Sequence, residues 1–100
     1  MLRKYVIERE IAGVGKLGKS QLGGSAATSN QALRQVGGVQ WQHSYVTADR
    51  TYCIYLAESE AAIRRHAEIS GFPATRIVEV SGIIDPASEK DCEKVLAEMI

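Results

Sequence analysis

Residues 41–56, WQHSYVTADRTYCIYL, have the pattern of two β-strands joined by a short turn. β-branched and aromatic residues are concentrated on both sides of residues 48–50, which interrupt the pattern. A connection this short makes the two strands antiparallel neighbours. We therefore expect strands at 39–47 and 50–57, and we expect the rest of the chain to be arranged around this hairpin.

Two further strands and two helices flank the hairpin. Alternating apolar residues predict strands at 3–11 and 76–84. Apolar residues at helical spacing predict helices at 21–36 and 59–70, and each helix is followed by glycine. A last helix is expected to begin at Pro86, because proline is favoured in the first helical position.

The order of these elements, βαββαβ, predicts an α+β fold. Right-handed crossovers place the four strands in an antiparallel sheet of order 4-1-3-2 with both helices on one face, a ferredoxin-like sandwich. A chain of 100 residues is long enough for one such domain. We assign residues 1–86 to the domain and residues 87–100 to a C-terminal helical extension of it. The apolar stripe of this extension is Cys92, Val95, Leu96 and Met99.

Strand alternation also assigns side chains to the two faces of the sheet. The face covered by the helices is expected to carry Tyr5, Ile7, Tyr52, Ile54 and Leu56. The open face is expected to carry Val6, Glu8, Cys53, Tyr55, Ile77, Glu79 and Ile83. An open face this apolar is unfavourable in water. We therefore expect a homodimer in which two sheets face each other around a cavity, a dimeric α+β barrel.

Composition limits the classes of function. Twelve basic and twelve acidic residues give no net charge, which argues against a nucleic-acid partner. Cys53 and Cys92 are too few for a disulfide framework and are expected to be reduced thiols. No apolar run approaches the length of a membrane span, and the charged start MLRKYVIERE is unlike a signal peptide. We therefore expect a cytoplasmic protein without a membrane partner.

Residues 13–20, GVGKLGKS, match the spacing of a phosphate-binding loop. Such a loop also needs a parallel α/β sheet around it and a second acidic strand for magnesium, and the predicted hairpin fold supplies neither. We interpret these residues as a flexible loop in which Ser20 is the N-cap of the helix at 21–36. No cofactor-binding residue is assigned.

Five side chains are candidate metal ligands: His43, Glu8, Glu79, His66 and Cys53. Imidazole, carboxylate and thiolate groups together suit nickel, zinc or copper. No two candidates have the close spacing of a local ligand pair, so a site must be assembled across strands or across a dimer. His43 is the main candidate, because its strand lies at an edge of the sheet. For His66 we favour a hydrogen-bonded position in the core.

Two other functions fit the same residues. The first is an enzyme or small-molecule binder that holds an organic substrate in the cavity between two sheets. Its candidate residues are His43 as general base, Glu8 or Tyr55 as the orienting group, and Tyr45. The second is a structural dimerisation module. No residue is assigned as catalytic, since the tyrosines are better explained as core or interface residues and Trp41 as an interface anchor.

Four segments carry a family resemblance: KYVIEREI at 4–11, WxHSYVTxDRxYCIYLA at 41–57, Ex2IRRHAEISGFP at 60–73 and RIVEV at 76–80. They resemble a family of small bacterial proteins that includes nickel-binding or nickel-responsive members. The resemblance implies a ferredoxin-like fold and a dimer. It also implies nickel as the preferred divalent metal.

Overall fold

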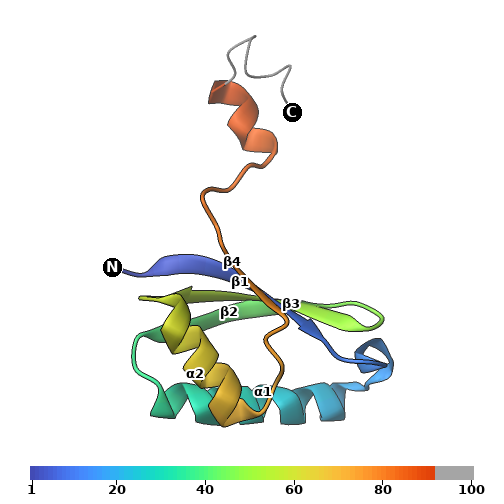
Figure 1. Cartoon of the computed structure of the whole chain (residues 1–100). Helices are drawn as coiled ribbons and strands as arrows, with labels where there is room; N and C mark the ends of the chain where they lie inside the picture. Colours follow the sequence, from blue (N-terminus) through green and yellow to red (C-terminus); the bar gives the residue numbers. More distant parts are fainter. Residues whose placement is uncertain (92–100) are drawn as a thin grey trace.

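Four strands form a single antiparallel sheet with two α-helices on one of its faces, in a computed structural model that describes residues 1–91 (Figure 1). The strands are β1 (Arg3–Glu10), β2 (Val39–Val46), β3 (Arg50–Ala57) and β4 (Arg76–Glu79). The helices are α1 (Lys19–Gln35) and α2 (Glu60–Ser70), with short 3-10 helices at Val14–Lys16 and Pro86–Asp91. The predicted α+β fold with a four-stranded antiparallel sheet is confirmed. The predicted stripe Cys92, Val95, Leu96 and Met99 lies outside the described residues.

The strand order is β2-β3-β1-β4, so β1 and β3 are central and β2 and β4 are the edges. Read from the β4 edge, this order is 4-1-3-2. Within residues 1–91 the sheet is open and is not closed into a barrel. None of the helices in this part of the chain is long and apolar enough to cross a bilayer.

Strand β4 has four residues and is shorter than the predicted strand at 76–84. Its last contact with the sheet is a hydrogen bond of 2.8 Å from the amide of Val80 to the carbonyl of Lys4. The chain then leads away from the sheet on the side opposite the helices (Figure 1). Ile83 and Ile84 in this segment are 71% and 66% exposed.

The helix ends follow local capping rules. Ser59 is the N-cap of α2, as predicted, and its hydroxyl accepts a hydrogen bond from a first-turn amide at 3.3 Å. Gly71 ends the same helix with φ at 79°, a left-handed conformation that glycine adopts without strain. The prediction of Ser20 as the N-cap of α1 is wrong. Gly18 occupies that position, and its amide donates to the side-chain oxygen of Gln21 at 3.2 Å.

The core lies between the helices and the face of the sheet that carries Ile7 and Tyr5. The strand register pairs Ile7 with Cys53 and Tyr5 with Tyr55. Directly opposed residues of antiparallel strands point to the same face, so Cys53 and Tyr55 are buried under the helices. The prediction for β3 is therefore inverted. Its open-face residues are Tyr52, Ile54 and Leu56.

Strand β4 is inverted in the same way. Ile77 pairs with Ile7 and packs against the core, while Val78 pairs with Val6 and is 42% exposed on the open face. Ile83 lies beyond the strand, in the exposed segment. The residues predicted on the open face that lie on the helix side instead are Cys53, Tyr55, Ile77 and Glu79. Val6 and Glu8 lie on the open face, as predicted.

A β-bulge interrupts β2 at Gln42. Trp41 pairs with Tyr55 and His43 pairs with Ile54, so two residues of β2 advance the register by only one residue of β3. The extra residue switches the faces of the side chains that follow it. Trp41 points under the helices, whereas His43 points to the open face.

Candidate functional site

His43 is an exposed imidazole on the open face of the sheet. Its Nε2 atom lies 3.1 Å from the hydroxyl of Tyr45, and the two rings are nearly perpendicular, at 85°. Both side chains reach this face because the bulge at Gln42 precedes them. The contact with Tyr45 therefore holds the imidazole at Nε2 on an exposed side chain.

Glu8 lies on the same face, on β1, and its carboxylate is hydrogen-bonded to two other side chains. Its Oε1 atom accepts a hydrogen bond from Arg50 at 2.8 Å and another from the hydroxyl of Tyr52 at 3.5 Å. Arg50 and Glu8 are both partly exposed, so this ion pair is screened by water. Both contacts use Oε1, so the other carboxylate oxygen can act as a ligand while the contacts with Arg50 and Tyr52 persist.

The three remaining ligand candidates lie elsewhere. Glu79 forms an ion pair with Arg3 at 2.8 Å at the β4 side of the sheet. His66 and Cys53 are buried in the core, at 1% and 6% exposure. No group of three His, Cys, Asp or Glu side chains that can hold a metal is present within residues 1–91. The five predicted ligands therefore do not converge on one point of a single chain.

His66 lies between α2 and α1, in the core position that the sequence favours. Its Nε2 atom is 3.2 Å from both the hydroxyl and the carbonyl oxygen of Ser29. The Ser29 hydroxyl is also 3.3 Å from the hydroxyl of Tyr55, which links α2, α1 and β3. Burial raises the pKa of the Tyr55 phenol and lowers the pKa of the His66 imidazole.

The lowered pKa of His66 makes stability depend on pH. The unfolded chain binds a proton at this residue at a higher pH than the folded chain does, so stability rises with pH between the two pKa values. We expect the free energy of unfolding to fall as the pH drops below about 6.5, the ordinary pKa of histidine, and to level off below the folded-state pKa.

Urea midpoints measured in metal-free buffer from about pH 8 to about pH 5.5 test this dependence, above the range where carboxylates titrate. His66→Gln should remove the slope, because glutamine does not titrate. His43→Ala is the matched control and should keep the slope, because it leaves the buried His66 in place. A His66→Gln protein with the wild-type slope would show that His66 does not cause the pH dependence of stability.

The glycine-containing loop at 13–20 uses its amides within the fold. The amide of Gly13 donates to the carboxylate of Asp49 at 2.9 Å, and the amide of Gly15 donates to the carbonyl of Ala48 at 3.0 Å. Both acceptors belong to the turn between β2 and β3. The loop therefore packs against the hairpin, and these two amides are not directed at a phosphate.

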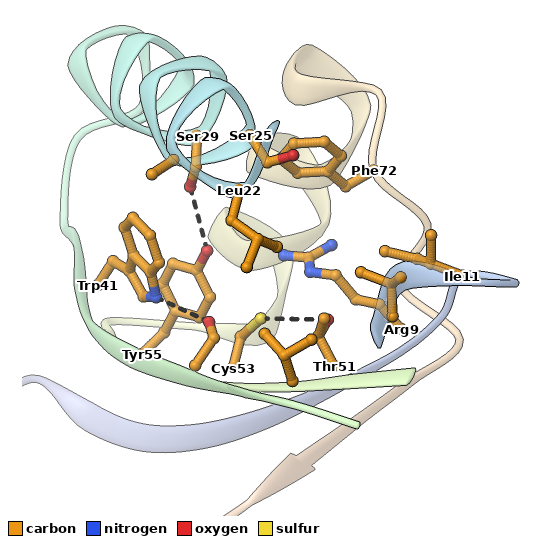
Figure 2. A pocket seen from close by; sticks show the side chains of 14 residues that line it. Arg9, Ile11, Leu22, Ser25, Ser29, Trp41, Thr51, Cys53, Tyr55 and Phe72 are labelled. Atoms are coloured by element: carbon orange, nitrogen blue, oxygen red, sulfur yellow. Dashed lines mark hydrogen bonds between the residues drawn. The ribbon is translucent and has the colours of Figure 1, made fainter. Parts of the chain in front are cut away.

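A pocket that the sequence pattern does not predict lies between α1 and the helix-facing side of the sheet (Figure 2). Its volume is about 230 Å³. Arg9, Ser29, Trp41, Cys53 and Tyr55 are among the residues that line it. Arg9 occupies an inward position on β1 between apolar neighbours. This charge within an inward apolar stripe is the one sequence signal for the pocket. Trp41, predicted as an interface anchor, instead lines this pocket and stacks on Tyr55 with the ring centroids 6.4 Å apart.

Fold and site together define a small α+β protein with one open sheet face that carries a histidine. Residues 5–80 match the family described as nickel responsive protein SCO4226-like. The chain belongs to this family, in agreement with the resemblance drawn from its motifs.

A crystal structure of SCO4226 from Streptomyces coelicolor A3(2) has a similar fold. It superposes with a TM-score of 0.68 and 19% sequence identity, over 81% of this chain and 99% of that one. At this identity the likeness concerns the fold. No curated protein sequence matches the chain at a significant level.

Proposed function

We propose that two copies of this chain pair through the open faces of their sheets and bind nickel with His43. The observation that carries the proposal is the position of His43: the bulge in β2 places the exposed histidine of a nickel-responsive family member on the open sheet face. Neutral imidazole is a good ligand for nickel.

The chemistry of the open face supports pairing. Its central strands present Val6, Ile54 and Leu56, and its edges present Val78 and Tyr45, which are 42% and 60% exposed. A contiguous apolar surface of this kind is typical of a protein–protein interface. The exposed segment with Ile83 and Ile84 leaves the sheet on the same side (Figure 1), so it extends the apolar surface that a partner copy would cover.

Two-fold symmetry also supplies the ligands that one chain lacks. In an isologous interface each residue is present twice, so two imidazoles form one site in a pairing that brings His43 beside the two-fold axis. Tyr45 orients the imidazole through its hydroxyl. Glu8 lies on the same face and is the carboxylate that would complete the set through the oxygen that Arg50 does not bind.

Calorimetric titration of metal-free protein with nickel, and with zinc for comparison, tests metal binding. We expect one nickel ion per two chains and at least about a ten-fold loss of affinity in His43→Ala, the range seen when a supporting interaction of a metal site is removed. His66→Gln is the matched control and should retain binding, because His66 is buried on the helix side. Absence of heat with either metal, or wild-type affinity in His43→Ala, would contradict the proposal.

Light scattering tests the pairing. We expect a dimer for the wild type and a monomer for Val78→Glu, which places a charge on the open face. Ile69→Glu is the control, since Ile69 is exposed on α2 and lies on the other side of the sheet. A monomeric wild type, or a dimer that Val78→Glu leaves intact, would contradict pairing through this face.

A further inference from the structure

The guanidinium of Arg9 is a buried positive charge in the pocket between α1 and the sheet. Arg9 is 2% exposed, and among the described residues no carboxylate forms an ion pair with it. Its Nη1 atom donates to the carbonyl of Pro73 at 2.7 Å, and its charge lies 5.9 Å from the centre of the Phe72 ring. These contacts compensate the charge only in part, because neither partner carries a negative charge.

The second terminal nitrogen, Nη2, is buried and has no hydrogen-bond partner among residues 1–91. Figure 2 shows the guanidinium reaching away from β1 toward Leu22, into the middle of the lining side chains. A buried donor without a partner costs stability, and buried polar groups in proteins are nearly always paired. An acceptor inside the pocket would pair this donor, and a negatively charged acceptor would also balance the buried charge of Arg9.

We propose that this pocket binds a small organic carboxylate, whose charged group pairs with Arg9 and whose apolar body fills the rest of the cavity. This inference is separate from the nickel site, which lies on the opposite face of the sheet. Arginine binds carboxylates with short, charge-assisted hydrogen bonds, and Nη2 is free to donate one.

The lining gives the chemical class of the ligand. Away from Arg9 the walls are mostly apolar: Ile11, Val14, Leu22, Ala26, Trp41, Val46 and Phe72. Such a surface favours an aliphatic or aromatic body over a fully hydrated inorganic anion. The hydroxyls of Ser29 and Tyr55 lie in the same pocket and are hydrogen-bonded to each other.

The volume limits the size of the ligand. A cavity of about 230 Å³ is smaller than the roughly 300–1,000 Å³ of typical small-molecule pockets, so it suits a small ligand. The pocket reaches the surface beside Val46, which is 43% exposed at the end of β2. A short-chain or single-ring carboxylate therefore fits, and a larger cofactor does not.

Benzoate is the probe, with benzamide as its neutral equivalent of the same shape. We expect benzoate to shift the amide resonances of residues that line the pocket in nuclear magnetic resonance titrations. Benzamide should bind at least about ten-fold more weakly, because it lacks the charge that pairs with Arg9. Inorganic phosphate at the same concentration should not displace benzoate.

Two variants separate the role of the charge from the role of the cavity. Arg9→Gln should weaken benzoate binding at least about ten-fold, with circular dichroism used to confirm that it folds. Ala26→Leu fills the cavity from α1 and should abolish binding while leaving Arg9 in place. Ala61→Leu, at an exposed position of α2, is the matched control and should bind as the wild type does.

Several results would overturn the proposal. Equal affinities for benzoate and benzamide would show that Arg9 does not recognise charge. Displacement by phosphate would show an unspecific anion site. Benzoate shifts confined to residues outside the pocket, or unchanged binding in Ala26→Leu, would show that the cavity is not the site. The Ala26→Leu and benzamide results decide the question even if Arg9→Gln does not fold.

Discussion

Ile63→Ala is expected to lower the free energy of unfolding by about 2–5 kcal/mol. Ile63 is 1% exposed and is one of the largest fully buried side chains of the described residues. It extends from α2 into the cluster formed with Ile7 and Tyr55 of the sheet. Truncation removes its buried methyl groups from that cluster and leaves a cavity that rigid strands cannot close. The loss is measured as a shift of the urea midpoint at constant slope.

Ile69→Ala on the same helix is the matched control. Ile69 is 36% exposed, so the change removes less buried surface, and alanine is the better helix former. We expect a loss below about 1 kcal/mol, within the range of surface substitutions. Equal losses for the two variants would show that α2 is not held to the sheet through Ile63.

Gly15→Ala is expected to destabilise the fold by about 1–3 kcal/mol, the usual cost of overpacking. A Cβ atom at Gly15 would lie 2.6 Å from the carbonyl oxygen of Thr47 and 2.8 Å from the Cα atom of Ala48. Both are backbone atoms of the turn between β2 and β3, so neither can move aside by changing a rotamer. The substitution forces apart the contact that holds the loop at 13–20 against the hairpin, and thermal unfolding measures the effect.

Gly23→Ala is the opposite case and serves as its control. Gly23 lies within α1, and a Cβ atom there meets nothing within 4 Å. Alanine should raise stability by up to about 1 kcal/mol, because glycine loses more backbone entropy in a helix. If both variants change stability in the same direction, the close approach at Gly15 does not control packing of the loop.

The sequence predicted the elements well because each had a local signal. Alternation located the strands, Ser59 and Gly71 marked the ends of α2, and the turn at 48–50 made the hairpin antiparallel. The buried position of His66 also followed from the apolar stripe of its helix. Each of these features is set by residues that are close together in the sequence, so a local pattern is enough to predict it.

The faces of β3 could not be predicted in the same way. Both of its stripes are rich in apolar residues, with Cys53 and Tyr55 on one and Ile54 and Leu56 on the other. Period two separates the stripes but does not say which one the helices cover. The pairing with β1 decides this, and pairing is a tertiary property.

The site depended on two features with weaker signals. The bulge at Gln42 has no signature in the residues around it. Simple alternation puts Trp41 and His43 on one face, whereas the bulge puts them on opposite faces. Arg9 did carry a signal, since a charge interrupts the inward stripe of β1. The residue type obscures this signal, because arginine is almost never fully buried in proteins unless it is paired.

Trp41 gives the pocket an optical property. It is the one tryptophan in the chain, and it stacks on Tyr55 inside the cavity. Indole emission responds to the polarity of its surroundings and to nearby quenching groups. The ultraviolet fluorescence of the unlabelled protein therefore comes mainly from the pocket wall. Its wavelength and intensity therefore respond to ligand binding in the pocket, whereas changes on the open face of the sheet affect them little.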